Sequence, residues 1–339
     1  MDEAVRECTI CRSSSKFLGV NFGVYTCKAC QMFFRRVISQ IVVLQPCRPN
    51  GPCAPKCKMC RFQKCIQSGM LYLPTTICLG PENRDMISAL LYNVKQFEAD
   101  RVYKLENCYI PGDPTALEIA QSGKLNFQRR PDALLMDSME WGYISALAAI
   151  DYMQKCPCIH SLAIEDQAVV FKKCLLPISL LADGMRAVRA GRDFICFPDG
   201  TEIVQMHHEA ISPQFDELVR SRVAGKANEL RLTIEEALLL SLIIMTSPAI
   251  PGLSLSAQTS FKLSQKSYSP ALLNYCFLNY KEGATRFVEL LDMIKTLNAT
   301  GNDLGQHYFL RAINRDPALV KRLFLLRNDS NKLLQMTSQ

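Results

Sequence analysis

The cysteines are the residues in this sequence whose spacing most directly implies chemistry. Cys8 pairs with Cys11 and Cys27 with Cys30 in two Cys-x-x-Cys motifs, with fifteen residues between them. Four such thiolates match a closed, tetrahedral structural zinc site, which has no open position for catalysis. The surrounding segment holds too little apolar material to fold without a metal. We therefore predict one zinc ion bound by these four residues.

A second cysteine group follows in the stretch CRPNGPCAPKCKMCRFQKC. Any four of its five thiols could coordinate a second zinc ion, and the spacing favours the first four, which leaves the fifth as a buried thiol. The favoured ligands are Cys47, Cys53, Cys57 and Cys60, and the remaining thiol is Cys65.

The cysteine distribution also indicates the compartment. Nine of the sixteen cysteines lie at or before Cys65. The chain begins MDEAVREC, without the basic and apolar regions of a secretory signal, so we expect a reducing compartment and zinc ligands rather than disulfides. We also find no apolar run long enough to span a bilayer, and we expect no membrane partner.

Positive charge is concentrated in the same region. Residues 1 to 70 hold eleven Lys and Arg against three acids, a net charge of +8, whereas the whole chain has +7. Between Glu7 and Glu82 there is no acidic residue. This pattern is typical of a surface that binds a polyphosphate, although an inert basic segment is the alternative.

The stretch CKACQMFFRRVIS combines both features and is expected to form a two-faced helix. At about 100° per residue, one side is apolar or metal-binding and the other is polar. The first side carries Cys30, Phe33, Phe34 and Val37, and the second carries Lys28, Gln31, Met32, Arg35 and Ser39.

Helical signals prevail in the elements beyond this segment. A helix is expected near residues 84 to 106. Thr233 and Glu236 form a capping box before the very apolar run TIEEALLLSLIIMTS, which Pro248 should end. Further helices are expected in ATRFVELLDMIKTLN and ALVKRLFLLRN. The stretch DFICFPDGTEIVQM predicts a hairpin with its turn at residues 198–200. These signals indicate an all-helical core with one small hairpin.

The motifs NFGVYTCKACQMFFRR, CKMCRFQKC and SGM resemble the DNA-binding domain of the nuclear hormone receptors, especially its divergent nematode-type branch. The resemblance implies that the helix after Cys27 is a recognition helix with Phe33 and Phe34 packed inward. It implies major-groove contacts from Lys28, Gln31 and Arg35, and phosphate contacts from Arg36, Arg61 and Lys64.

Two departures from that family bear on specificity. Gln31 stands where the family usually has a lysine, so an adenine-pairing amide replaces a guanine-reading cation. The spacer between Cys53 and Cys57 is only APK, whereas the family has about nine residues there. The half-site preference and the function of the second zinc module therefore stay open.

The stretch AIDYMQKCPCIHSLAIEDQAVVFKKC resembles the signature of the family's ligand-binding domain. The matching residues are Pro157, Leu162, Asp166 and Gln167, and the Asp-Gln pair could equally have a plain capping role. The resemblance places Lys172 in a coactivator groove, while the other groove lysine falls on Gln154, one residue before Lys155. Near the C-terminus, LLQM has Gln335 where the family has a coactivator-capping glutamate, so activation by the usual charge clamp is in doubt.

We interpret the chain as a small, α-rich, two-zinc DNA-binding domain followed by an all-α helical-sandwich ligand-binding domain. The expected boundaries are 5–73 for the zinc domain, 74–115 for a hinge and 116–339 for the helical domain. The resemblance implies a nuclear, zinc-dependent, sequence-specific transcription factor. Its expected partners are double-stranded DNA, a second receptor in a homodimer or heterodimer, a coregulator and a small lipophilic ligand.

Three other classes of protein are the alternatives. One is a receptor-like protein with impaired DNA binding that acts by dimerisation or partner sequestration. A second, a cysteine-only zinc module of a ubiquitin ligase, is disfavoured by the cation-rich helix. An enzyme is not expected, because no phosphate loop, nucleophile elbow or dinucleotide fingerprint occurs. The histidines also lack any motif around them: His160, His207, His208 and His307.

Overall fold

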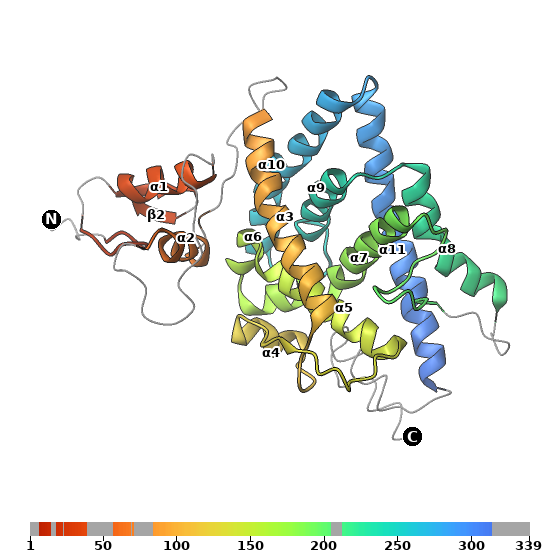
Figure 1. The fold of residues 1–339 in the computed structure, drawn as a ribbon. Helices are drawn as coiled ribbons and strands as arrows, with labels where there is room; N and C mark the ends of the chain where they lie inside the picture. Colours follow the sequence, from red (N-terminus) through yellow and green to blue (C-terminus); the bar gives the residue numbers. More distant parts are fainter. Residues whose placement is uncertain are drawn as a thin grey trace.

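The computed structural model describes residues 7–14, 18–22, 24–38, 57–68, 70, 84–204 and 212–313. In Figure 1, α1, β2 and α2 form one group and the helices from α3 onward form another. The predicted fold class, a cysteine-rich zinc domain followed by a helical domain, is confirmed by this arrangement.

A hairpin in the zinc domain leads directly into a helix. Strand β1 (Leu18–Asn21) pairs antiparallel with β2 (Val24–Cys27), and α1 (Lys28–Ile38) starts at the next residue. Helix α2 (Lys58–Gln67) packs against α1. The small core between them contains Phe34, whose ring lies 5.1 Å from Phe22 and 5.8 Å from Phe62. This aromatic cluster fixes the inward side of both helices.

The helical domain is built around one long helix. Helix α7 packs against α4, α5, α8, α9 and α11, so it lies in the middle of the domain. The elements of this domain are α3 (Arg84–Asn107), β3 (Cys108–Tyr109), α4 (Ala116–Ser122), β4 (Gln128–Arg129), α5 (Ser138–Gln154), α6 (Pro157–His160), α7 (Ile164–Ala190), α8 (Pro213–Glu229), α9 (Ile234–Met245), α10 (Leu255–Asn279) and α11 (Gly283–Ile313).

Local signals in the sequence predicted several of these elements. The capping box of α9 is confirmed: the Thr233 N–H donates to Glu236 at 2.9 Å, and the Glu236 N–H donates to the Thr233 hydroxyl at 3.3 Å. Helix α9 is buried along its whole described length except its first two residues. The helix expected near 84 to 106 is α3, and ATRFVELLDMIKTLN lies in α11. The stretch ALVKRLFLLRN lies outside the described residues.

The predicted hairpin at 193–206 is shorter than a regular strand pair. Its described part has one antiparallel bridge, between Cys196 and Glu202, around a turn in which Gly200 has φ of +90°. A turn of this kind needs a residue that tolerates the left-handed region, which explains the glycine. The two-stranded sheet of the helical domain is β3 with β4, a pairing of two-residue strands that the sequence did not predict.

Helix α3 bears on the domain boundaries. It lies within the expected hinge, 74–115, yet it packs against α5 and α9 and buries Ile87, Val94 and Leu105 in the helical core. The boundaries stay predictions, and we propose that the helical domain begins with α3. Among the described helices, none is both long and apolar enough to cross a membrane.

Candidate metal site and nucleic-acid interface

The hairpin and α1 bring the four predicted cysteines of the first zinc site together. Cys8 and Cys11 lie in the turn before the hairpin, Cys27 ends β2, and Cys30 lies in the first turn of α1. All four sulfurs lie within 4.8 Å of one another, and the sulfurs of Cys11 and Cys27 are 3.7 Å apart. Zn–S bonds of about 2.3 Å in a tetrahedron place sulfurs about 3.8 Å apart. The four residues are therefore positioned to bind zinc.

Polar groups around the sulfurs support a thiolate site. The Cys27 N–H donates to Cys8 Sγ at 3.3 Å, and the Ser13 hydroxyl lies 3.0 Å from Cys11 Sγ. Burial would raise the pKa of Cys11, but hydrogen bonds with Ser13, Cys8 and Cys27 outweigh it and lower that pKa to about 6. At neutral pH the exposed Cys11 thus offers an anionic ligand to an arriving cation.

The second cysteine group is described only in part. Cys57 and Cys60 are half-buried at the start of α2, while Cys47 and Cys53 lie outside the described residues. The predicted second zinc ion therefore stays a prediction. Cys65 is fully buried in the core with Phe34 and Met70, as expected of a thiol that packs, and this burial raises its pKa to about 12.

Helix α1 has a buried side and an exposed side, as the sequence predicted, but Phe33 and Val37 of the predicted inner face are only half-buried, as are Gln31 and Met32 of the predicted outer face, and Ser39 lies outside the described residues. Cys30 and Phe34 are 0% and 1% exposed, whereas Lys28, Arg35 and Arg36 are exposed and Gln31 is half-exposed. The inward side is fixed by the zinc ligands and the aromatic cluster, so the cations cannot rotate inward. The outward side therefore presents the hydrogen-bond donors of Lys28, Gln31 and Arg35 to the surroundings.

The predicted phosphate contacts divide into two kinds. Arg36 on α1 and Lys64 on α2 are exposed. Arg61 instead turns toward the first zinc site, where its Nη2 donates to Cys30 Sγ at 3.2 Å and its guanidinium lies 4.5 Å from the Phe33 ring centroid. Sequence reasoning missed this contact. The available signal was the four-residue spacing to the buried Cys65, which puts Arg61 on the inward side of α2.

The Asp-Gln pair of the helical domain has a structural role. Asp166 accepts hydrogen bonds from the Ser254 N–H at 2.8 Å and the Ser254 hydroxyl at 2.7 Å, which anchors the start of α10. Gln167 donates to the carbonyl of Leu162 at 3.0 Å and so closes the loop before α7. The plain capping role considered for this pair is thus part of its function, although Asp166 caps a distant helix.

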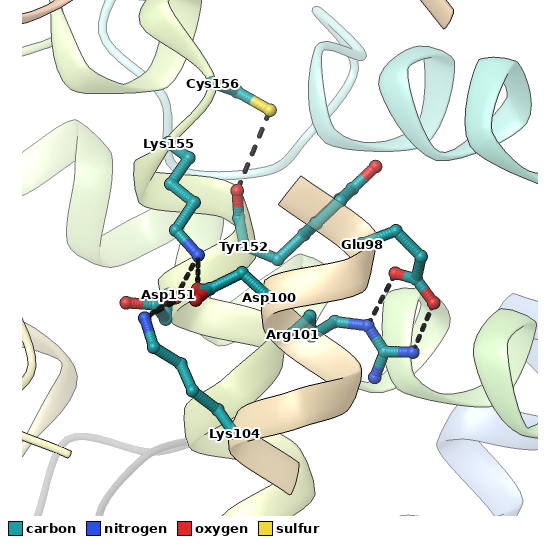
Figure 2. Close-up of polar contacts among 8 residues, drawn as sticks. All are labelled: Glu98, Asp100, Arg101, Lys104, Asp151, Tyr152, Lys155 and Cys156. Atoms are coloured by element: carbon teal, nitrogen blue, oxygen red, sulfur yellow. Dashed lines mark hydrogen bonds and ion pairs between the residues drawn. The ribbon is translucent and has the colours of Figure 1, made fainter. Parts of the chain in front are cut away.

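Lys155, the basic residue next to the expected groove position, lies in an ion-pair cluster. Figure 2 shows Lys104 and Lys155 around Asp100 and Asp151, where they join α3 to the end of α5. Lys104 Nζ lies 2.8 Å from both carboxylates, and Lys155 Nζ lies 2.6 Å from Asp151 and also pairs with Asp100. Gln154, at the expected position, donates to the Ile119 carbonyl. Lys172 is half-buried on α7, and Gln335 lies outside the described residues.

The site and the fold define a class of protein: a receptor with a four-cysteine zinc module for DNA and a helical ligand-binding domain. Two family models match the chain. The double treble clef zinc finger of C4 type covers residues 6–72, and the ligand-binding domain of nuclear hormone receptor covers residues 126–313. The chain belongs to the nuclear hormone receptor family, whose members are transcription factors.

Similar proteins occur in Caenorhabditis elegans. The nuclear hormone receptor family member nhr-167 is 31% identical over 336 residues, which cover 95% of this chain and 97% of the relative. Family member nhr-9 is 29% identical and covers 94% of this chain and 95% of its own. Family member nhr-27 is 27% identical over 91% of this chain and 88% of the relative. The similarity therefore extends over both domains, as the nematode-type motifs predicted.

Proposed function

We propose that this receptor is a nuclear, sequence-specific DNA-binding transcription factor that reads its site with α1. The observation that carries the proposal is the orientation of that helix. Its inner side is fixed by Cys30 and Phe34, and its outer side presents Lys28, Gln31 and Arg35. Because the backbone and the orientation of the helix are already fixed, binding in the major groove needs to order only the exposed side chains.

Gln31 gives the proposed interface a distinct base preference. A glutamine amide pairs bidentately with adenine N6 and N7, whereas a lysine at this position would contact guanine O6 and N7. The guanidinium of Arg35 can pair bidentately with guanine O6 and N7. We therefore propose a half-site in which one position prefers adenine where a lysine-bearing receptor selects guanine.

Arg36 and Lys64 are proposed to fix the register through phosphates. Both are exposed, and they lie on the two helices of the zinc domain. No acidic residue occurs between Glu7 and Glu82 to compete with DNA for these cations. Such contacts supply affinity and salt dependence but no sequence information.

The test of the base preference compares the full chain with its Gln31→Lys variant in a selection from a randomised duplex pool. We expect one enriched position to change from adenine to guanine, by about 1–3 kcal/mol of discrimination, because one bidentate pair replaces another. Arg36→Ala serves as the matched control and should weaken binding without changing the enriched sequence. An unchanged consensus in the lysine variant would refute the assignment of Gln31.

Regulation is proposed to run through the helical domain, with a small lipophilic ligand, a coregulator and a second receptor as partners. The geometry supports a departure from the usual charge clamp, because Lys155 is neutralised by Asp100 and Asp151. Lys172 is the remaining proposed groove cation.

Lys172→Ala should therefore reduce coregulator-peptide binding. Lys155→Ala should lower stability and leave peptide affinity unchanged. The reverse pattern would refute this assignment.

A further inference from the structure

Arg61 lies on the inward side of α2 although arginine is usually an exposed residue. It is half-buried, its Nε is buried without a hydrogen-bond partner, and Phe62 and Cys65 on the same helix contact the same core. The exposed cations of α2 are Lys58 and Lys64. The helix therefore directs one cation inward and two outward, and the inward one requires a separate explanation.

The partner of the Arg61 guanidinium is a zinc ligand on another element. Nη2 donates to Cys30 Sγ at 3.2 Å, and the guanidinium stacks on the Phe33 ring at 4.5 Å. Both partners belong to α1. The hydrogen bond and the stacking contact use the planar fork of arginine together, which a lysine ammonium cannot reproduce.

Cys30 is the ligand that most needs such a donor. Its side chain is 0% exposed, so water cannot solvate the sulfur. Four thiolates around one divalent zinc ion carry a net charge of about −2, and buried anions require hydrogen bonds or a nearby cation. Cys8 has a backbone donor and Cys11 has Ser13 beside it. Arg61 supplies Cys30 with both a donor and a positive charge.

We propose that Arg61 is a positioning residue of the first zinc site rather than a phosphate contact, and that its hydrogen bond to Cys30 ties α2 to the bound metal. A phosphate-binding arginine offers its donors to solvent, whereas here one donor lies on the sulfur, another is buried and one face of the guanidinium covers Phe33. The hydrogen bond and the stacking contact therefore join α2 to the residues of α1 that would hold the zinc ion.

The experiment uses the full chain and its Arg61→Leu, Arg61→Lys and Lys64→Leu variants. Zinc affinity is measured by competition with a chromophoric chelator, and cobalt(II) replaces zinc so that the sulfur-to-metal charge-transfer bands report on the thiolates. Binding to one fixed mixed-sequence DNA duplex is measured over a range of salt concentrations. Metal and DNA readouts are thereby obtained on the same proteins.

For Arg61→Leu we expect a 10–100-fold loss of zinc affinity and shifted charge-transfer bands, as is typical when a donor to a metal ligand is removed. The slope of log affinity against log salt should stay unchanged. The matched control Lys64→Leu removes an exposed cation from the same helix. It should keep the wild-type zinc affinity and make the negative salt slope less steep by about 0.9, the value for one lost phosphate contact.

The proposal would be overturned by a wild-type zinc affinity in Arg61→Leu, or by a salt slope that is less steep by about 0.9 in that variant. If Arg61→Leu does not fold, Arg61→Lys decides, because it keeps the charge and lacks the fork. An intermediate zinc affinity with shifted bands supports the proposal, and a wild-type affinity and spectrum overturn it. The metal measurements stand even if the chain binds no DNA, so failure of the proposed function would be separately visible.

Discussion

Cys30 joins three parts of the zinc domain at a single residue. It lies in the first turn of the proposed recognition helix, its sulfur belongs to the metal site, and it accepts a hydrogen bond from Arg61 of α2. Zinc coordination at this position therefore sets the start of α1 and the position of α2 at once. The metal contributes folding free energy that the small apolar core of so short a segment cannot supply alone.

Cys30→Ser should unfold the zinc domain and abolish zinc binding at the first site. A structural zinc ion contributes about 10 kcal/mol of folding free energy in small domains, and a serine hydroxyl is a poor zinc ligand. The measurement is zinc stoichiometry together with near-ultraviolet circular dichroism of the full chain. Cys276→Ala, which removes a buried thiol from α10, is the control and should keep the wild-type zinc content. A folded, zinc-binding Cys30→Ser protein would contradict the assigned ligand set.

Arg35→Ala should reduce sequence discrimination while leaving the zinc content intact. Arg35 is exposed on α1, away from the metal, and a bidentate arginine–guanine pair contributes about 1–3 kcal/mol of discrimination. Quantitative binding to an enriched site and to a scrambled one checks this. Lys124→Ala, which removes an exposed cation from the helical domain, should have no effect. Equal discrimination in Arg35→Ala and the wild type would remove Arg35 from the reading face.

At the scale of elements, α9 is fixed by one buried carboxylate. Glu236 is 0% exposed, closes the capping box with Thr233, and receives two hydrogen bonds of 2.7 Å from Arg286 of α11. Burial alone would raise the pKa of Glu236, but the hydrogen bonds from Arg286 and Thr233 outweigh it and lower that pKa. The Glu236 side chain therefore caps the start of α9 and also joins α9 to α11.

Glu236→Gln should destabilise the helical domain by about 3 kcal/mol, because the buried Arg286 loses both of its short hydrogen bonds to a carboxylate and keeps only the longer, 3.7 Å ion pair with the exposed Glu289. Glu235→Gln is the matched control. The Glu235 carboxylate pairs with Lys95 at the surface, where such ion pairs contribute less than about 1 kcal/mol. Urea unfolding can be followed by the fluorescence of Trp141, the single tryptophan, which is 4% exposed. Equal losses in the two variants would contradict the role given to the Glu236–Arg286 pair.

The same pair predicts the direction of the pH dependence. A carboxylate with a lowered folded-state pKa stabilises the protein above its unfolded pKa of about 4.3, and this contribution is lost as the pH falls through the folded value. The wild type should thus lose stability on acidification below about pH 4.5 more steeply than Glu236→Gln does. Parallel stability curves for the two proteins in that range would show that Glu236 is not the group responsible.

How far the sequence could predict an element depended on whether its cause was local. The capping box of Thr233 and Glu236, the two-faced helix α1 and the first cysteine set follow from short-range spacing, and the structure confirms them. The contact of Arg61 with Cys30 and the ion pair of Lys155 with Asp100 join residues that are 31 and 55 positions apart. No local pattern encodes such contacts, and for that reason Arg61 resembled a surface cation.

The strand pairs illustrate the same limit. The predicted hairpin around Gly200 was visible because its turn residues are distinctive, but the pairing of β3 with β4 joins two-residue strands with no alternating pattern to detect. Similarly, the expected hinge contains α3, whose burial depends on α5 and α9. Its helical character was predictable, whereas its membership in the core was not.

At the scale of the whole molecule, charge separates the two domains. Residues 1 to 70 carry +8 while the remainder is close to neutral. A surface of this kind attracts DNA through phosphate neutralisation and counterion release, so its affinity must fall steeply with salt. The remainder of the chain, which includes the helical domain, has no comparable excess of positive charge. This division of charge supports the proposal that the zinc domain reads DNA and that regulation runs through the helical domain.

DNA reading by α1 can be tested through the affinity of the zinc-loaded full chain for a site selected from a randomised duplex pool, measured at several salt concentrations. We expect one enriched site, a specific affinity about 10³-fold or more above that for a scrambled duplex, and a steep linear loss of log affinity with log salt. A zinc-loaded, folded chain that enriches no site would contradict DNA reading by α1 and favour a receptor that acts by binding and sequestering partners.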